Sequence, residues 1–198
     1  MNLFKSKSVS ARSFWMILLG VAAIVMFSGF WSGKTVDERR AERLQSSNET
    51  LQILYKHAPE AKEMIANSYG YAAFSNVGVN LFMISAEGGM GLAHVNNTGK
   101  NIYMNMASGG MGFGLGIKDF RAVFLFENKA VFDQFVNEGW EANAQADAAA
   151  KLVDKGGAIG AAITVAPGIR LYKLTQNGLA LQATIQGTKY WKDGDLNK

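Results

Sequence analysis

The chain has no cysteine, and only two prolines and two histidines occur among its 198 residues. The absence of cysteine excludes disulfide bridges, thiolate catalysis and zinc sites built from thiolates. The two histidines, His57 and His94, belong to no HExxH sequence and to no pair with the spacing of metal ligands. We therefore expect no bound metal ion.

Sequences that mark common catalytic and nucleotide sites are missing as well. The chain contains no GxxxxGK[ST] phosphate loop, no dinucleotide fingerprint between a strand and a helix, and no GxSxG nucleophile turn. No pair of carboxylates stands out by its position. We expect a protein that is not an enzyme and that uses no cofactor.

Most of the chain also lacks an excess of charge of either sign. Four of the 20 lysines and arginines fall in residues 1–34, which hold no acid, so the remaining 16 balance the 16 acidic residues. The formal net charge of +4 and the isoelectric point near 9.2 thus come from the beginning of the chain. This distribution excludes a basic nucleic-acid-binding domain, and we expect no nucleic-acid partner.

One long apolar run, residues 14–31, contains 18 residues without a charge. As a helix it would extend over about 27 Å, which suffices for the hydrocarbon core of a bilayer. Trp15 and Trp31 stand near its ends, where indole rings favour the headgroup layer. The end of the run offers no pair of small residues that suits a signal peptidase.

We therefore expect a basic cytoplasmic leader of residues 1–13, an uncleaved anchor over residues 14–31, and a single domain over residues 34–198. The domain would lie on the outer side of the membrane, in the periplasm or another extracytoplasmic space of the cell envelope. Export after cleavage of a signal peptide is the alternative.

Two stretches show helical periodicity. Residues 34–68 predict a long amphipathic helix with a kink or break at Pro59, and Asn128 to Glu138 predicts a short helix that stops at Gly139. The apolar positions of the long helix are Leu44, Leu51, Leu54, Tyr55, Ala58, Met64 and Ile65.

Beyond Tyr69 the pattern changes to a period of two, which is typical of strands. Turn signals at 96–99 and 176–178 predict two hairpins, and the alternation over 141–148 favours another strand with a face of small residues. The fold class we expect is α+β. An N-terminal helix or helix pair would pack on a curved, glycine-rich antiparallel sheet or open barrel, with a short helix near 128–138.

A glycine at every second position distinguishes the stretch 109–117. If it forms one strand, its glycines share one bare face against which another element packs closely or a ligand binds. These are Gly110, Gly112, Gly114 and Gly116.

Five cations of the long helix are candidates for contact with anionic headgroups: Arg39, Arg40, Arg43, Lys56 and Lys62. The alternative is that neighbouring acids, three or four positions away, neutralise them. Asp193, Asp195 and Asn197 imitate the beginning of a calcium loop that is not completed, and we expect an exposed polar tail there.

The order of these motifs resembles the SYLF domain family over roughly residues 40–192. The resemblance rests on the segments NSYGYAAFSNVG, EGGMGLAHV, ASGGMGFGLGIKDFRAVFLFEN and GIRLYKLTQNGLALQATIQG. Asn101 to Met104 stands where that family usually has Trp-Ser-x-Pro.

The resemblance implies a non-enzymatic domain that binds acidic phospholipids, often through a basic or amphipathic N-terminal helix. Fungal members also bind actin filaments, which we do not expect of an exported bacterial chain. We expect a membrane-tethered protein that binds phospholipid or another apolar ligand at a membrane surface. The alternative is a structural module of the cell envelope that binds a protein partner through the glycine-rich strand face.

Overall fold

The computed structural model describes residues 33–81, 84–111, 116–142, 162–175, 178–179 and 187–198. The chain divides into two compact units, residues 1–35 and 36–198, and the second is described below. Among the described residues, no helix combines the length and the apolar character needed to cross a bilayer. The predicted anchor, residues 14–31, lies outside the described residues.

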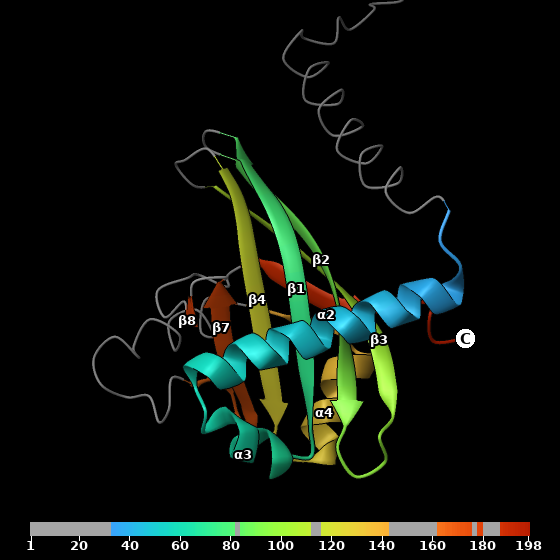
Figure 1. Cartoon of the computed structure of the whole chain (residues 1–198), viewed down its shortest axis with the longest axis vertical. Helices are drawn as coiled ribbons and strands as arrows, with labels where there is room; N and C mark the ends of the chain where they lie inside the picture. The colour runs from blue at the N-terminus through green and yellow to red at the C-terminus, as the bar shows by residue number, and fades with distance from the viewer. Residues whose placement is uncertain (1–32, 82–83, 112–115, 143–161, 176–177, 180–186) are drawn as a thin grey trace, which may run out of the picture. The chain divides into compact units, whose positions relative to one another are not determined.

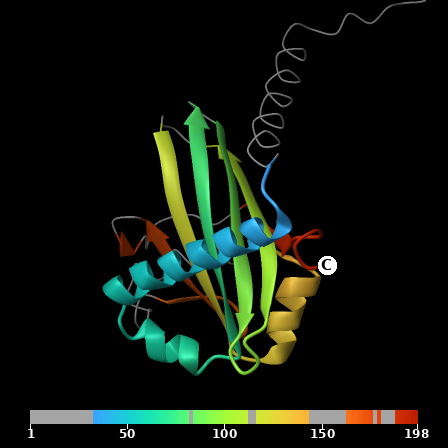
Figure 2. The ribbon, with the colours of Figure 1, turned by 45° about the vertical axis from the view of Figure 1, so that its right-hand side comes forward.

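The predicted helix pair is confirmed. Helix α2 extends over Val36–His57 and helix α3 over Ala61–Ala66, and the break between them falls at Pro59 (Figure 1). Proline cannot donate the backbone hydrogen bond that a continuing helix requires. Figure 2 shows α2 running obliquely across the long strands, which extend well past it on one side.

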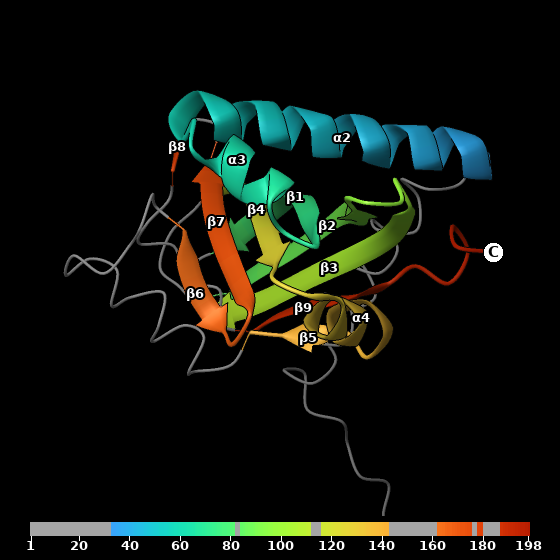
Figure 3. The same ribbon diagram turned by 90° about the horizontal axis from the view of Figure 1, so that it is seen from below.

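The described strands form one antiparallel sheet, in the order β5-β9-β3-β2-β1-β4-β7-β6, with β8 paired to β7. Seen along the strands, the sheet curls into an open barrel (Figure 3). The predicted α+β class is therefore confirmed. The strand bounds are Gly70–Leu81 (β1), Ile84–Val95 (β2), Asn101–Met111 (β3), Gly116–Phe126 (β4), Trp140–Glu141 (β5), Ile163–Ala166 (β6), Ile169–Thr175 (β7), Gly178–Leu179 (β8) and Thr188–Lys192 (β9).

Both predicted hairpins occur. Strands β2 and β3 are joined at 96–99, where Gly99 has a φ of 69° and its N–H bonds to the carbonyl oxygen of Val95 at 2.9 Å. Strands β7 and β8 pair through Leu174 opposite Leu179. The predicted small-residue strand near 141–148 begins with β5, and its remainder lies outside the described residues.

The interior of the barrel is filled by apolar side chains, the largest of which are aromatic. Helix α4, Lys129–Asn137, lies at one end of the barrel (Figure 3) and presents Phe132, Phe135 and Val136 to this core. The helix begins at Asn128, whose side chain accepts a hydrogen bond from the Val131 N–H, and stops before Gly139, as predicted. The other large members of this core include Phe74, Phe124, Phe126, Met104 and Tyr190.

A second, smaller core lies between the outer face of the sheet and the helices α2 and α3. Leu51, Leu54 and Ile65 pack there against Val123 and Tyr172. Leu44, which we expected on the same stripe, is instead 41% exposed. Leu44 lies about a quarter-turn away from the face of α2 that is buried against the sheet. In the first half of α2 that face is formed by polar residues, Arg43, Ser47 and Thr50.

The prediction of one glycine-lined strand over 109–117 is wrong. Gly110 belongs to β3 and Gly116 to β4, and these two strands run in opposite directions with β2 and β1 between them. Gly112 and Gly114 lie outside the described residues. The alternation of residue types could not reveal that the chain changes strand within the run.

Close packing on bare glycines does occur, but on β2. A Cβ atom at Gly91 would collide with the carbonyl oxygen of Ala73 and would lie 2.6 Å from a ring carbon of Phe74. At Gly89 it would lie 2.7 Å from Cβ of Asn76. These glycines let the large inward side chains of β1 cross over the neighbouring strand.

The unit that begins at Val36 contains every residue of both cores, so we expect a chain shortened to residues 33–198 to fold by itself. In it, Gly91→Ala should lower the free energy of unfolding by about 2–3 kcal/mol, because backbone and an aromatic ring fill the space of the new methyl group. Urea unfolding followed by circular dichroism measures this change. The control is Gly194→Ala, where no atom lies within 4 Å of the added Cβ, and a loss there as large as that of Gly91→Ala would contradict the packing argument.

Candidate functional site

The first half of α2 turns a polar stripe towards the sheet. Arg43, Ser47 and Thr50 are spaced by four and three residues and are 1%, 2% and 1% exposed. Thr50 accepts a hydrogen bond at 3.2 Å from the guanidinium of Arg121 on β4. The helix is thus held to the sheet by polar contacts in its first half and by leucines in its second half.

Arg43 joins three parts of the fold. Its Nη1 donates to the carbonyl oxygen of Met104 at 2.5 Å, and its Nη2 donates to Oδ1 of Asn105 at 2.8 Å and to Oδ2 of Asp193 at 2.7 Å. Helix α2, strand β3 and the residues after β9 therefore meet at one buried guanidinium. A planar, permanently charged fork with several donors suits such a junction better than an ammonium would.

The C-terminal residues form a structured loop, so the prediction of an exposed tail is wrong. Asp193 is 4% exposed, and its Oδ1 accepts the N–H groups of Asp195 and Leu196 at 2.9 and 3.0 Å. The amide of Asn197 accepts from the N–H of Tyr103 and donates to its carbonyl oxygen. A lone aspartate after a strand carries no signal of a buried arginine partner 150 residues away.

Arg39 and Arg40 bind the same loop. Arg39 Nη2 lies 3.6 Å from Oδ2 of Asp193, and Arg40 donates from Nε to the carbonyl oxygen of Leu196 and from Nη2 to that of Lys198, each at 3.0 Å. The Arg40 guanidinium also lies 5.9 Å from the ring centre of Tyr103. Internal contacts therefore engage three of the five candidate cations, and the burial of Arg43 does not fit the headgroup role expected of it.

The electrostatics of the junction favour the ionised pair. Burial by itself raises the pKa of Asp193, but the N–H groups of Leu196 and Asp195 and the charge of Arg43 outweigh it, and the net pKa is lowered. Burial lowers the pKa of Arg43, and the carboxylate of Asp193 opposes that change. Both groups are charged at neutral pH.

The other two candidate cations lie at the opposite end of the helix pair. Lys56 stands in the last turn of α2 and Lys62 in α3, and both side chains are exposed. The structure therefore does not bring the five cations together into one basic patch. Two remain at the surface where α2 meets α3, and three lie at or beneath the start of α2.

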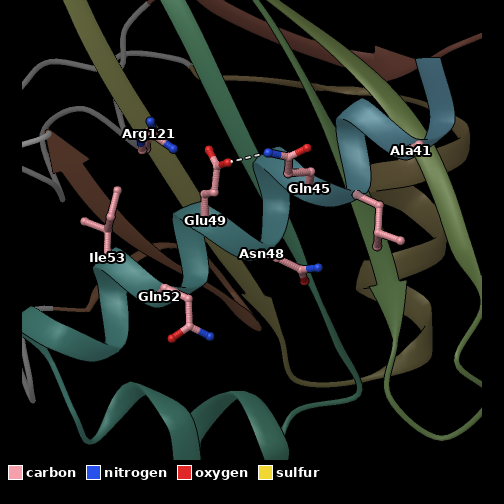
Figure 4. Close-up of a pocket in the computed structure, with 8 residues that line it drawn as sticks. Ala41, Gln45, Asn48, Glu49, Gln52, Ile53 and Arg121 are labelled. Atoms are coloured by element: carbon pink, nitrogen blue, oxygen red, sulfur yellow. Dashed lines mark hydrogen bonds between the residues drawn. The ribbon is translucent and has the colours of Figure 1, made fainter. Parts of the chain in front are cut away.

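A shallow groove of about 640 Å³ runs along the outer face of α2 (Figure 4). Glu49 is the only ionisable acid or base in the stretch from Leu44 to Ile53, and its carboxylate accepts a hydrogen bond from Gln45 at 2.9 Å. Much of the lining surface is carbon. The lining residues are Ala41, Leu44, Gln45, Asn48, Glu49, Gln52, Ile53 and Arg121.

Sequence reasoning missed both the buried arginine and the groove. A signal was present, since Arg43 falls on the same helix face as Leu51 and Leu54 and would be expected to be buried with them. Among the residues that the structure describes, no group of three or more histidines, aspartates or glutamates could hold a metal ion.

No family model matches the chain. The chain is similar to a protein of Aeromonas veronii named Beta cell expansion factor A, with 33% identity over 167 residues. The aligned part covers 83% of this chain and 61% of the relative, so the chain spans about three-fifths of the length of the protein it matches.

The substitution Asp193→Asn should lower the free energy of unfolding at neutral pH by about 3 kcal/mol, because it leaves the buried guanidinium of Arg43 without its counter-charge. Thermal or urea unfolding of residues 33–198 measures this loss. The matched control is Asp195→Asn, which removes an exposed carboxylate bonded to Lys198 and should change the stability by less than about 0.5 kcal/mol.

The same pair predicts a dependence on pH. Because folding lowers the pKa of Asp193, its stabilisation is complete above the pKa of an unfolded aspartate, about 3.9, and is lost as pH falls through the lower folded value. The difference in unfolding free energy between the wild-type protein and Asp193→Asn should stay constant from pH 8 to pH 5 and shrink below about pH 4. A difference that persists unchanged to pH 2 would show that the charge of Asp193 is not its source.

Proposed function

We propose that this chain is a non-enzymatic domain of the SYLF type that binds phospholipid at a membrane surface, to which residues 14–31 tether it. The motif order of residues 40–192 supports the family, and helix α2 agrees with the N-terminal helix that the resemblance implies. The relative's name describes beta cell expansion and no ligand. We therefore argue lipid binding from the surface of the domain.

The observation that carries the proposal is the outer face of α2. Helix faces that only meet water are usually rich in charge, whereas the groove on this one has a largely apolar surface and only two charged lining residues, Glu49 and Arg121. Leu44 is 41% exposed there, and Ile53 lines the same groove. Such a face can lie in the interfacial region of a bilayer, with its amides among the headgroups and its aliphatic side chains below them.

Electrostatic attraction contributes less to the proposed membrane binding than apolar contact does. Lys56 follows the groove on the outer face of α2, and each exposed lysine near an anionic surface contributes on the order of 1 kcal/mol. Because internal contacts engage Arg39, Arg40 and Arg43, we expect only a modest preference for anionic over neutral vesicles. The alternative of a partner bound through the glycines of 110–116 loses its premise, since those glycines do not share one strand.

Co-sedimentation of residues 33–198 with vesicles tests the proposal. We expect recovery with vesicles of phosphatidylcholine and phosphatidylserine, and Leu44→Glu should weaken the partition roughly tenfold because it places a charge where an apolar side chain meets the interface. The control is Ala130→Glu, which adds the same charge to an exposed position of α4. Equal recovery with anionic vesicles, with neutral vesicles and without vesicles would remove the lipid function.

A further inference from the structure

Three large apolar side chains remain exposed among the described residues: Val36 at 42%, Leu44 at 41% and Trp191 at 41%. Val36 opens α2 and Leu44 lies about two turns further along the same helix. Trp191 comes from the other end of the chain, on β9. An exposed tryptophan is unusual, because burying an indole ring stabilises a fold more than burying most other side chains does.

The junction around Arg43 brings Trp191 to the first half of α2. Trp191 pairs across the sheet with Asn105, whose side chain accepts a hydrogen bond from Arg43. Two residues further on, Asp193 lies 3.6 Å from Arg39, one turn after Val36. Trp191 and Val36, from the two ends of the domain, thus both lie at the edge of the domain around the Arg43 junction.

The charges at this edge are mixed. Lys192 follows Trp191 in β9 but lies opposite Met104, on the other face of the sheet, and Lys198 is exposed and pairs with Asp195. Asp37 and Glu38 lie in the first turn of α2, and Asp37 bonds to Arg40 at 3.4 Å. The edge is therefore no strong cationic patch. Its indole is the group that prefers the headgroup region of a bilayer to water.

We propose that Trp191, together with Val36, enters the headgroup layer and orients the domain on the membrane. An indole prefers this layer because its ring is apolar and its N–H is a hydrogen-bond donor. Only four residues separate Trp31 from Val36, so α2 follows the proposed anchor closely along the chain. The inference rests on the proposed lipid function and assigns a place to it.

The first test is vesicle partition of residues 33–198. Trp191→Ala should reduce partition to vesicles of phosphatidylcholine and phosphatidylserine roughly tenfold. Lys62→Glu, a change of charge on the far helix α3, should have a smaller effect than Trp191→Ala. Circular dichroism and urea unfolding confirm that each variant keeps its fold, as expected for exposed positions.

The second test uses the full chain in proteoliposomes. Because the chain has no cysteine, Gly194→Cys, three residues after Trp191, and, as control, Lys62→Cys each provide a single site for a fluorescent label and keep the indole. Lipids with a quencher near the headgroup should quench the label at 194 several-fold more strongly than the label at 62.

The possible results separate the two proposals. Binding of residues 33–198 that Trp191→Ala leaves unchanged, together with equal quenching at both labelled sites, would overturn the role of Trp191 and leave the lipid function standing. No binding of residues 33–198 to any vesicle would overturn the lipid function and this inference with it.

Discussion

The fold of this domain depends on one buried charge. The guanidinium of Arg43 is 1% exposed and is bonded to a carbonyl oxygen of β3, to an amide on the same strand and to the carboxylate of Asp193. Removing a charge from water is costly unless its donors are bonded and its charge is paired, and here both conditions hold. The junction fixes the start of α2 and the end of the chain at the edge of the sheet, and it determines which cations face solvent.

The interior of the barrel follows a different principle, in which large and bare residues alternate between neighbouring strands. Phe74 and Asn76 of β1 face inward beside Gly91 and Gly89 of β2, and the ring of Phe74 lies 4.7 Å from that of Tyr190 and 6.0 Å from that of Phe124. The aromatic rings fill the end of the barrel next to α4 with edge-to-face contacts. The described interior is thus a packed core, whereas the outer surface of α2 carries a shallow groove.

Much of this architecture could be predicted from the sequence, because its signals are local. Pro59, Asn128, Gly139 and the turn at 96–99 each specify a backbone conformation within a few residues, and each was placed correctly. The site could not be predicted in the same way. The partners of Arg43 are 61 and 150 residues away, and the run 109–117 alternates in composition although the chain passes from β3 to β4 within it. The periodicity of apolar residues indicates which face of a helix or strand a residue occupies. It does not indicate which other segment of the chain that residue contacts.

The buried arginine and the charge-poor surface of α2 are two consequences of one arrangement. A helix that begins with three arginines within five positions would ordinarily present a cationic face to solvent, and the resemblance to lipid-binding domains would then imply binding by charge. Here Arg43 turns inward, Arg39 and Arg40 bind the C-terminal loop, and the stretch from Leu44 to Ile53 exposes leucine, amides and one carboxylate, that of Glu49. The proposed affinity for a membrane would then come chiefly from apolar contact and from an interfacial indole, which salt screens far less than it screens an ion pair. High salt should therefore weaken membrane binding by this domain much less than binding by a polybasic helix.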